Sequence, residues 1–182
     1  EQSFVNDAGD VDLKRWVTQL PLELADEDFQ RLILASEFGK KAAGRTGRDL
    51  ADWARVSDCF VAGLEITQVL ADLHVGTDCL VAGILYRAVR EERLTLEAVE
   101  REFGAEVSSL IDGVLRMAAI TDIQSQSENV VLGQADQQKD NLRKMLISLV
   151  DDVRVALIKL AERSCAIRAV KDDELRRRGV AQ

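Results

Sequence analysis

Few side chains in this sequence are of the kinds that bind metals or attack substrates. His74 is the only histidine among 182 residues, and it stands beside Gly76 just after a helical pattern, where an exposed or loop-packed side chain is a better interpretation than a metal ligand. Cys59, Cys79 and Cys165 form no CxxC pair and lie at apolar positions, where a free cysteine behaves as a small hydrophobic residue. The Gly-rich GxxxxGK[ST] and GxGxxG phosphate loops are also missing from the sequence. These residues alone predict no catalytic centre.

The composition indicates one soluble, mainly helical domain. Hydrophobic residues make up 47% and charged residues 31% of the chain, as in globular rather than disordered proteins. One proline and 11 glycines provide too few turn signals for a many-stranded β-protein. No apolar run reaches the roughly 18 residues of a membrane span, and the acidic start does not have the basic and then apolar order of a signal peptide.

Charge and cysteine usage narrow the expected partners and compartment. The net charge of −8 would repel a phosphate backbone or an anionic membrane, so we expect neither direct nucleic-acid binding nor membrane binding. Three widely spaced cysteines fit no disulfide framework and favour the reducing cytoplasm. The chain opens on Glu1 without an initiator Met and stops on a polar, Arg-rich end, which we interpret as a piece of a longer protein.

The sequence divides into an acidic N-terminal arm, residues 1–25, and a helical domain, residues 26–182. In the arm, the apolar patch around Trp16 predicts one short helix in an otherwise loose segment. In the domain, apolar residues recur at steps of three and four and predict an all-α fold. The segments with this pattern are 26–42, 57–73, 77–89, 95–99, 104–118, 142–150 and 153–170. With the helix of the arm, the expected total is about eight helices.

Two of these segments are apolar nearly all round, which predicts helices buried on all sides. They are residues 79–89, the expected centre of the fold, and residues 153–170. Thr77 is the expected N-cap of the first, and Asp151 or Asp152 of the second.

Two polar stretches separate the helical patterns. Residues 44–49 contain two glycines and two arginines and predict a loop, with an anion contact as the alternative. Residues 119–138 are polar without a sustained period and predict a long loop, of the kind that is usually functional or mobile.

Three stretches resemble the HD-type hydrolase domain of the RelA/SpoT alarmone enzymes. They are AGILYRAVREE at 82–92, FGAEVSSLIDGVL at 103–115 and NLRKMLISLVDDVRVALIKLAERSCAIR at 141–168. The third is the most specific, because it is similar to the family's Asn-x-Arg-Lys-Met-Leu followed by Asp-x-Arg-Val-x-Leu-Ile-Lys-Leu-Ala-Asp-Arg. With a weaker match over 56–73, the resemblance covers roughly two thirds of the chain and implies an HD-like helical bundle.

The resemblance also implies where the metal ligands of an active HD domain would lie. Such a domain binds a divalent cation through one isolated His, a His-Asp pair and a late Asp, since the cation needs several N and O ligands. Here these positions hold Ala62, Tyr86 with Arg87, and Glu162. We therefore expect no bound metal in this segment.

The remaining catalytic positions of the family are changed as well. The acidic pair that would handle the attacking water reads Arg90 and Glu91, and the late His-Asn pair reads Cys165 and Ala166. The resemblance therefore implies a degenerate hydrolase site without catalytic residues.

This pattern is similar to the RelA branch of the family, in which the N-terminal hydrolase domain is degenerate and an adjacent C-terminal domain makes (p)ppGpp from ATP and GTP or GDP. The implied function of this segment is a non-catalytic regulatory module, without a cofactor of its own, whose partner is the synthetase domain of its own chain. For the parent chain the resemblance implies a GTP diphosphokinase of the stringent response that uses Mg²⁺ with its nucleotides. Other parts of the parent would contact the ribosome and uncharged tRNA.

Two alternatives remain open from the sequence. One is a residual phosphohydrolase that uses Glu91, Glu92 and Glu162 with Mg²⁺, although the lost His ligands and the new arginines weigh against it. The other is a nucleotide-sensing pocket, in which cationic side chains hold a phosphorylated nucleotide. Its candidate residues are Arg87, Arg90, Arg143 and Lys144, although a row of arginines at helical spacing is more often solvated or ion-paired.

A specific arrangement is expected where the metal would have stood. A buried Glu162 without a metal needs a positive partner, and Arg87 can supply it through two parallel hydrogen bonds. Glu91, one helical turn from Arg87, is a second possible acceptor, and the Tyr86 ring would fill the space of the lost imidazole.

Overall fold

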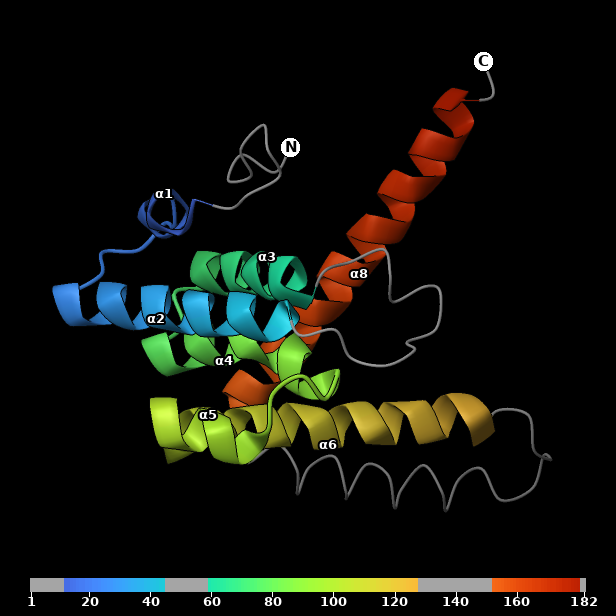
Figure 1. Cartoon of the computed structure of the whole chain (residues 1–182). Coiled ribbons are helices and arrows are strands. Elements are labelled where there is room, and N and C mark those ends of the chain that lie inside the picture. Colours follow the sequence, from blue (N-terminus) through green and yellow to red (C-terminus); the bar gives the residue numbers. More distant parts are fainter. Residues whose placement is uncertain (1–11, 45–58, 128–151, 181–182) are drawn as a thin grey trace.

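The computed structural model describes residues 12–44, 59–127 and 152–180, which form seven α-helices and no strand (Figure 1). The helices are α1 (Leu13–Thr18), α2 (Asp26–Ala43), α3 (Cys59–Asp72), α4 (Thr77–Arg90), α5 (Leu96–Phe103), α6 (Ala105–Ser127) and α8 (Val153–Val180). The expected all-α class is confirmed, with seven helices in the described part of the chain rather than about eight. The expected helix at 142–150 and most of the basic connector at 44–49 lie outside the described residues.

Helix α4 is the centre of the fold, as its apolar sequence predicts. It packs against α2, α3, α6 and α8, and Figure 1 shows it between the layer of α2 and α3 and the layer of α5 and α6. Every residue from Cys79 to Tyr86 is buried, and so are Ala88 and Val89. A helix that is hydrophobic all round has this environment because each of its faces needs an apolar neighbour.

Helices α3 and α4 approach each other closely because a glycine stands at the crossing. A Cβ atom added to Gly63 would lie 2.3 Å from the backbone oxygen of Ile84, so no larger residue fits without a shift of the backbone. Thr67 Oγ1 reinforces the crossing, since it lies 2.9 Å from the Gly63 oxygen in α3 and 3.2 Å from the Leu80 oxygen in α4. This contact holds α4 firmly at the centre.

Of the two expected caps, the one at Asp152 is confirmed and the one at Thr77 is wrong, and Thr95 is a cap that was not expected. Thr95 Oγ1 accepts a hydrogen bond from Ala98 N at 3.2 Å and caps α5, and Asp152 Oδ1 accepts one from Arg154 N at 2.9 Å at the start of α8. The prediction that Thr77 is an N-cap is wrong. The capping residue is Gly76, whose extended backbone directly precedes α4, so Thr77 already has helical conformation.

Two helices are longer than their patterns suggest. Helix α6 continues through Ser127, so the loop predicted from 119 is wrong for residues 119–127; residues 128–138 lie outside the described part. The reason is that no glycine or proline follows Gly113 before Ser127, and polar residues alone do not stop a helix. Helix α8 likewise runs to Val180 instead of ending near 170.

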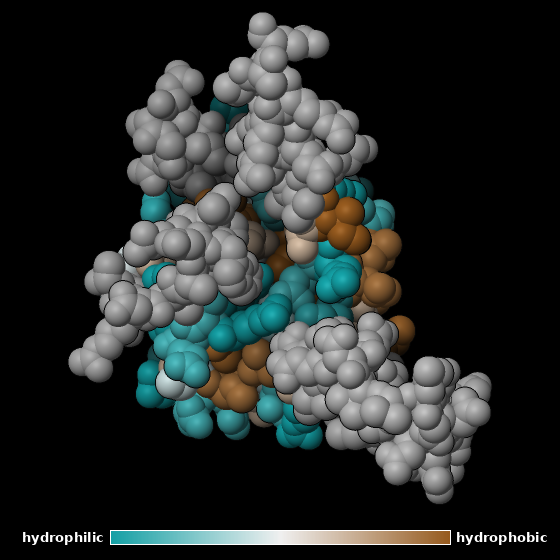
Figure 2. Space-filling view, turned by 90° about the vertical axis from the view of Figure 1, so that its right-hand side faces the viewer, coloured by the Kyte–Doolittle hydropathy of each residue, from teal (hydrophilic) through white to brown (hydrophobic). Residues whose placement is uncertain are grey.

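Helix α8 is not buried on all sides, contrary to the prediction. Val155, Ile158 and Ala161 are buried, whereas Leu160 is 63% exposed. The face of the molecule drawn in Figure 2 likewise shows apolar residues at the surface between hydrophilic ones.

Of the helices in the described part of the chain, none is long and apolar enough to cross a membrane.

The short helix expected in the N-terminal arm is present as α1. Trp16 is 1% exposed and Val17 is also buried, and both belong to the main hydrophobic core. This described portion of the arm is therefore packed on the domain rather than loose. The boundary between residues 25 and 26 stays a prediction.

Candidate functional site

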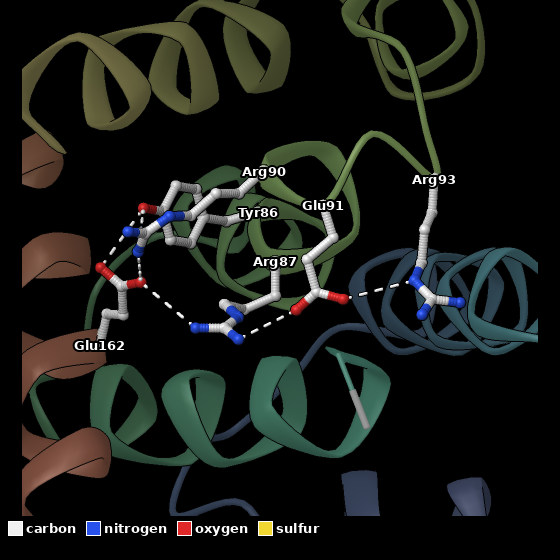
Figure 3. A network of polar contacts seen from close by, with 6 residues as sticks. All are labelled: Tyr86, Arg87, Arg90, Glu91, Arg93 and Glu162. Carbon is white, nitrogen blue, oxygen red and sulfur yellow. Dashed lines mark hydrogen bonds and ion pairs between the residues drawn. The ribbon is translucent and has the colours of Figure 1, made fainter. Parts of the chain in front are cut away.

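The polar centre of the domain is Glu162, a carboxylate on α8 that is only 6% exposed and faces the C-terminal end of α4 (Figure 3). Lys159 Nζ lies 2.7 Å from its Oε2, and the Tyr86 hydroxyl donates to the same oxygen at 3.3 Å. Its Oε1 accepts a short hydrogen bond from Arg90 Nη1 and lies 3.6 Å from Arg87 Nη1. One buried carboxylate is thus shared by three cations and a phenol.

Electrostatics keep Glu162 ionised and Tyr86 protonated. Burial raises the pKa of Glu162, but the hydrogen bond from Lys159 and the charges of Arg90, Lys159 and Arg87 outweigh burial and hold the pKa below the usual range of a glutamate. Burial and the adjacent carboxylate raise the pKa of the Tyr86 phenol far above its ordinary value. The Tyr86 hydroxyl is therefore a hydrogen-bond donor and not an anionic ligand.

A second carboxylate, Glu91, extends the polar network to the end of α2. Arg87 Nη2 lies 2.9 Å from Glu91 Oε1, and Arg93 Nε lies 3.3 Å from Glu91 Oε2. Arg93 Nη1 in turn donates to the Ala43 backbone oxygen in the last turn of α2 at 2.8 Å. Figure 3 shows the resulting row of alternating charges from Arg93 to Glu162.

The turn after α4 fixes the positions of Glu91 and Arg93. Arg93 N donates to the Ala88 oxygen at 2.9 Å and Glu92 N donates to the Val89 oxygen at 3.0 Å, which is the hydrogen-bond pattern of a Schellman motif. The left-handed position of this motif usually holds glycine, but here it holds Glu92 with φ of 56°. The motif directs Arg93 back towards α2.

The donor set does not fit the divalent cation of an active HD site. In the described residues, no group of three or more His, Cys, Asp or Glu side chains is placed to hold a metal ion. Arg87 and Arg90 have no lone pair to offer a cation, and the carboxylates they contact are already in ion pairs. The arrangement can stabilise buried charge and attract anions.

A family model described as an HD domain matches residues 45–182. The chain belongs to the HD domain family. Among curated relatives of this HD domain, a GTP pyrophosphokinase of Photobacterium angustum is 39% identical over 117 residues, which are 63% of this chain and 15% of the relative. A GTP pyrophosphokinase of Escherichia coli K12 is 29% identical over 176 residues, 93% of this chain and 21% of the relative. A third, from Myxococcus xanthus, is 33% identical over 111 residues, 61% of this chain and 14% of the relative.

These relatives confirm the expected resemblance to the HD domain of RelA/SpoT proteins. They also show that this HD domain spans about a fifth or less of the length of the GTP pyrophosphokinases that it matches. It therefore corresponds to one domain of a larger kind of protein.

The expected ion pair between Arg87 and Glu162 is present in the HD domain, but its geometry differs from the prediction. Two parallel hydrogen bonds were expected, whereas a single Arg87 nitrogen lies 3.6 Å from the carboxylate. The reason is that Glu91, which was expected as a second possible acceptor, accepts the hydrogen bond of Arg87. Arg90 then lies closer to Glu162 than Arg87 does. The Tyr86 ring, which the resemblance aligns with the family's imidazole, is fully buried in the core.

The other expected site residues that the structure describes lie outside this network. Ala62 is half-buried on α3, Cys165 is half-buried on α8, and Ala166 and Glu92 are exposed. Arg143 and Lys144 lie outside the described residues.

Burial raises the pKa of Cys165 and raises that of Cys79 to about 11, so neither thiol is poised as a nucleophile. His74 is exposed, with Nδ1 3.1 Å from the Asp72 oxygen.

Two members of the network, Lys159 and Arg93, were not among the expected site residues. Lys159 stands three residues before Glu162, a spacing at which opposite charges meet on a helix, so this pair could have been found from the sequence. Arg93 could not, since its position depends on the left-handed backbone of Glu92, which no glycine signals.

Proposed function

We propose that this HD domain is the catalytically inactive, regulatory domain of a RelA-type GTP pyrophosphokinase. The observation that carries the proposal is the ion-paired Glu162, which meets Arg87, Arg90 and Lys159. The resemblance aligns Arg87 and Glu162 with metal ligands of an active HD domain. Three positive charges at one carboxylate leave an incoming cation without a favourable place.

The energetics of the cluster support the absence of metal-dependent hydrolysis. A cation at Glu162 would have to displace Arg90 and Lys159 and would then stand beside buried or half-buried positive charges. Tyr86, at the position of the first residue of the family's His-Asp pair, offers a protonated phenol in place of an imidazole. A nucleophilic water has no metal to activate it there.

The wider role follows from the relatives, each of which is a GTP pyrophosphokinase. In the parent chain, an adjacent synthetase domain would transfer pyrophosphate from ATP to GTP or GDP with Mg²⁺, in the cytoplasm. This domain would restrain or support that synthetase, while other parts of the parent would meet the ribosome and uncharged tRNA.

A hydrolysis assay tests the proposed inactivity. The 182-residue chain is incubated with ppGpp and Mn²⁺ or Mg²⁺ at neutral pH, and pyrophosphate release is compared with that of the heat-denatured chain. We expect no release above this background. Turnover that disappears in Glu162→Ala would contradict the proposal, because it would show a working metal site.

A reversion experiment tests whether the replaced positions are the cause. The variant carries Ala62→His, Tyr86→His, Arg87→Asp and Glu162→Asp, and its Mn²⁺ binding is measured by calorimetry beside that of the unchanged chain. We expect binding by the variant alone. Equal binding by the unchanged chain would contradict the assignment of a lost metal site.

One observation favours a second candidate function, the sensing of a phosphorylated nucleotide. Four cations, Arg87, Arg90, Arg93 and Lys159, surround two carboxylates, Glu91 and Glu162. Within the described residues, Arg87 Nε is buried without a hydrogen-bond partner. Titration with ppGpp in the absence of metal tests this candidate; it requires binding that is lost in Arg87→Met, and an unchanged affinity in that variant would reject it.

A further inference from the structure

Arg87 stands between two carboxylates and satisfies them unequally. Its Nη2 is within hydrogen-bond distance of Glu91 Oε1, at 2.9 Å, whereas its Nη1 is 3.6 Å from Glu162 Oε1, beyond a good hydrogen bond. A guanidinium is planar and rigid, so a small movement towards one acceptor is a movement away from the other. The balance between the two contacts depends on what else neutralises each carboxylate.

Arg93 is the group that neutralises Glu91 from the other side. Arg93 Nε lies 3.3 Å from Glu91 Oε2, and its Nη1 donates to the Ala43 oxygen at 2.8 Å. The side chains of Glu91 and Arg93 are 10% and 19% exposed, so water screens their interaction only in part. The state of the last turn of α2 therefore affects the charge available to Arg87.

The backbone between these side chains carries strain that keeps the row in place. Glu92, between Glu91 and Arg93, has φ of 56°, a left-handed conformation that is unfavourable for a residue with a Cβ. Leu94, two residues after Glu92, is 8% exposed and anchors the turn in the core. A strained turn that is held by packing is a common feature of segments whose position matters for function.

We propose that Arg93, Glu91, Arg87 and Glu162 form a charge relay that couples the C-terminal end of α2 to α8. When Arg93 holds both the Ala43 oxygen and Glu91, Arg87 is free to share its charge with Glu162. When Arg93 withdraws, Glu91 keeps Arg87 to itself and Glu162 loses one of its cations. A change in the position of the last turn of α2 would thus alter how firmly α8 is held, and the relay requires no catalysis by the domain.

A double-mutant cycle tests the relay, because Arg93 and Glu162 form no direct ion pair. The unfolding equilibrium constants of the 182-residue chain, Arg93→Met, Glu162→Gln and the double variant are measured in urea. The cycle is then repeated with Arg87→Met in every member. We expect the two changes to be non-additive by about threefold to tenfold with Arg87 present, as for residues in one network, and additive without it.

Two results would overturn the relay. Additivity with Arg87 present would show that no coupling passes through the row. Equal non-additivity without Arg87 would show a direct long-range field instead.

A second measurement uses variants that keep Glu162 intact. Arg93→Met should shift the amide resonances of residues 159–163 on α8, and this shift should disappear in the Arg87→Met background. Arg101→Met removes an arginine that is 72% exposed and serves as the matched control. Amide shifts on α8 that are equal in Arg93→Met and Arg101→Met would overturn the relay.

Discussion

Helices α4 and α8 have similar apolar sequences but different surroundings. In α4, both sides of the helix are buried from Cys79 to Tyr86. In α8, one side is buried, whereas Val153, Leu160 and Ile167 on another side are 66%, 63% and 62% exposed. An apolar run therefore predicts a buried helix only where other helices exist to cover every side.

The arrangement of neighbours explains this difference. Helix α4 has α2, α3, α6 and α8 around it, whereas α8 packs on α3, α4 and α6, and Figure 1 shows its C-terminal part extending away from the other described helices. The three exposed residues are seven positions apart, so they drift by only about 20° per step and form a stripe about 21 Å long. The two helices meet through the ionised cluster around Glu162 rather than through this stripe.

The largest expected effect is at the carboxylate where the two helices meet. Glu162→Ala should lower the free energy of unfolding by about 3–5 kcal/mol, because it leaves Arg87, Arg90 and Lys159 without their shared partner in a buried site. Urea unfolding at neutral pH measures it. Glu102→Ala, which removes a carboxylate that is 44% exposed, is the matched control and should change stability by less than about 1 kcal/mol.

The pH dependence of this effect provides its own check. The pKa of Glu162 is lower in the folded than in the unfolded chain, so its contribution to stability is fully present above the unfolded value of about 4.3 and is lost as the pH falls through the folded value. The stability difference between the unchanged chain and Glu162→Gln should therefore shrink in acid. A difference that is the same at neutral and acidic pH would argue against an ionised Glu162.

The two sides of α8 should respond very differently to truncation. Ile158→Ala should cost about 2–4 kcal/mol, because the side chain is fully buried and its removal leaves a cavity. Leu160→Ala, two residues further on, should change the stability of this chain by less than about 0.5 kcal/mol, because the side chain is already exposed. Thermal or urea unfolding measures both. Similar costs for the two variants would mean that α8 is covered on both sides, as α4 is.

Sequence periodicity predicts most of the helices and the central place of α4, because a buried face leaves apolar residues at a regular spacing. It does not predict where α6 ends, since no glycine or proline marks that point, nor which side of α8 stays exposed, since neighbours are a property of the assembled fold. At the site, the replaced positions Arg87 and Glu162 indicate an ion pair. That Arg87 pairs more closely with Glu91, and that Arg90 takes its place at Glu162, is visible only in the structure.

Two glycines at helix crossings, Gly63 facing α4 and Gly113 facing α8, allow a comparison of how tightly α4 and α8 are packed. A Cβ at Gly63 would lie 2.3 Å from a backbone oxygen of α4, whereas a Cβ at Gly113 would lie 2.8 Å from the Val155 Cγ2 atom of α8. Gly63→Ala should therefore cost about 2–3 kcal/mol by overpacking. Gly113→Ala should cost less, about 1–2 kcal/mol, since only the side chain of Val155 and no backbone atom is in the way, and alanine favours the helix. Equal costs, measured by thermal unfolding, would show that the α6–α8 contact is as rigid as the α3–α4 contact.

The smallest expected effect is a gain in stability at the C-terminal end of α4. Glu92 occupies the left-handed position of the Schellman motif, where glycine is favoured because it has no Cβ to oppose a positive φ. Glu92→Gly should therefore raise the free energy of unfolding by about 1 kcal/mol, and thermal unfolding can detect such a shift. Glu92→Ala is the matched control: it removes the same exposed carboxylate but keeps a Cβ, so it should bring no comparable gain. Equal gains in the two variants would assign the effect to lost negative charge beside Glu91 rather than to relief of backbone strain. His74→Gly, at the other non-glycine residue with positive φ in the described part of the chain, should give a similar increase at the end of α3 and tests the same cause without the charge relay.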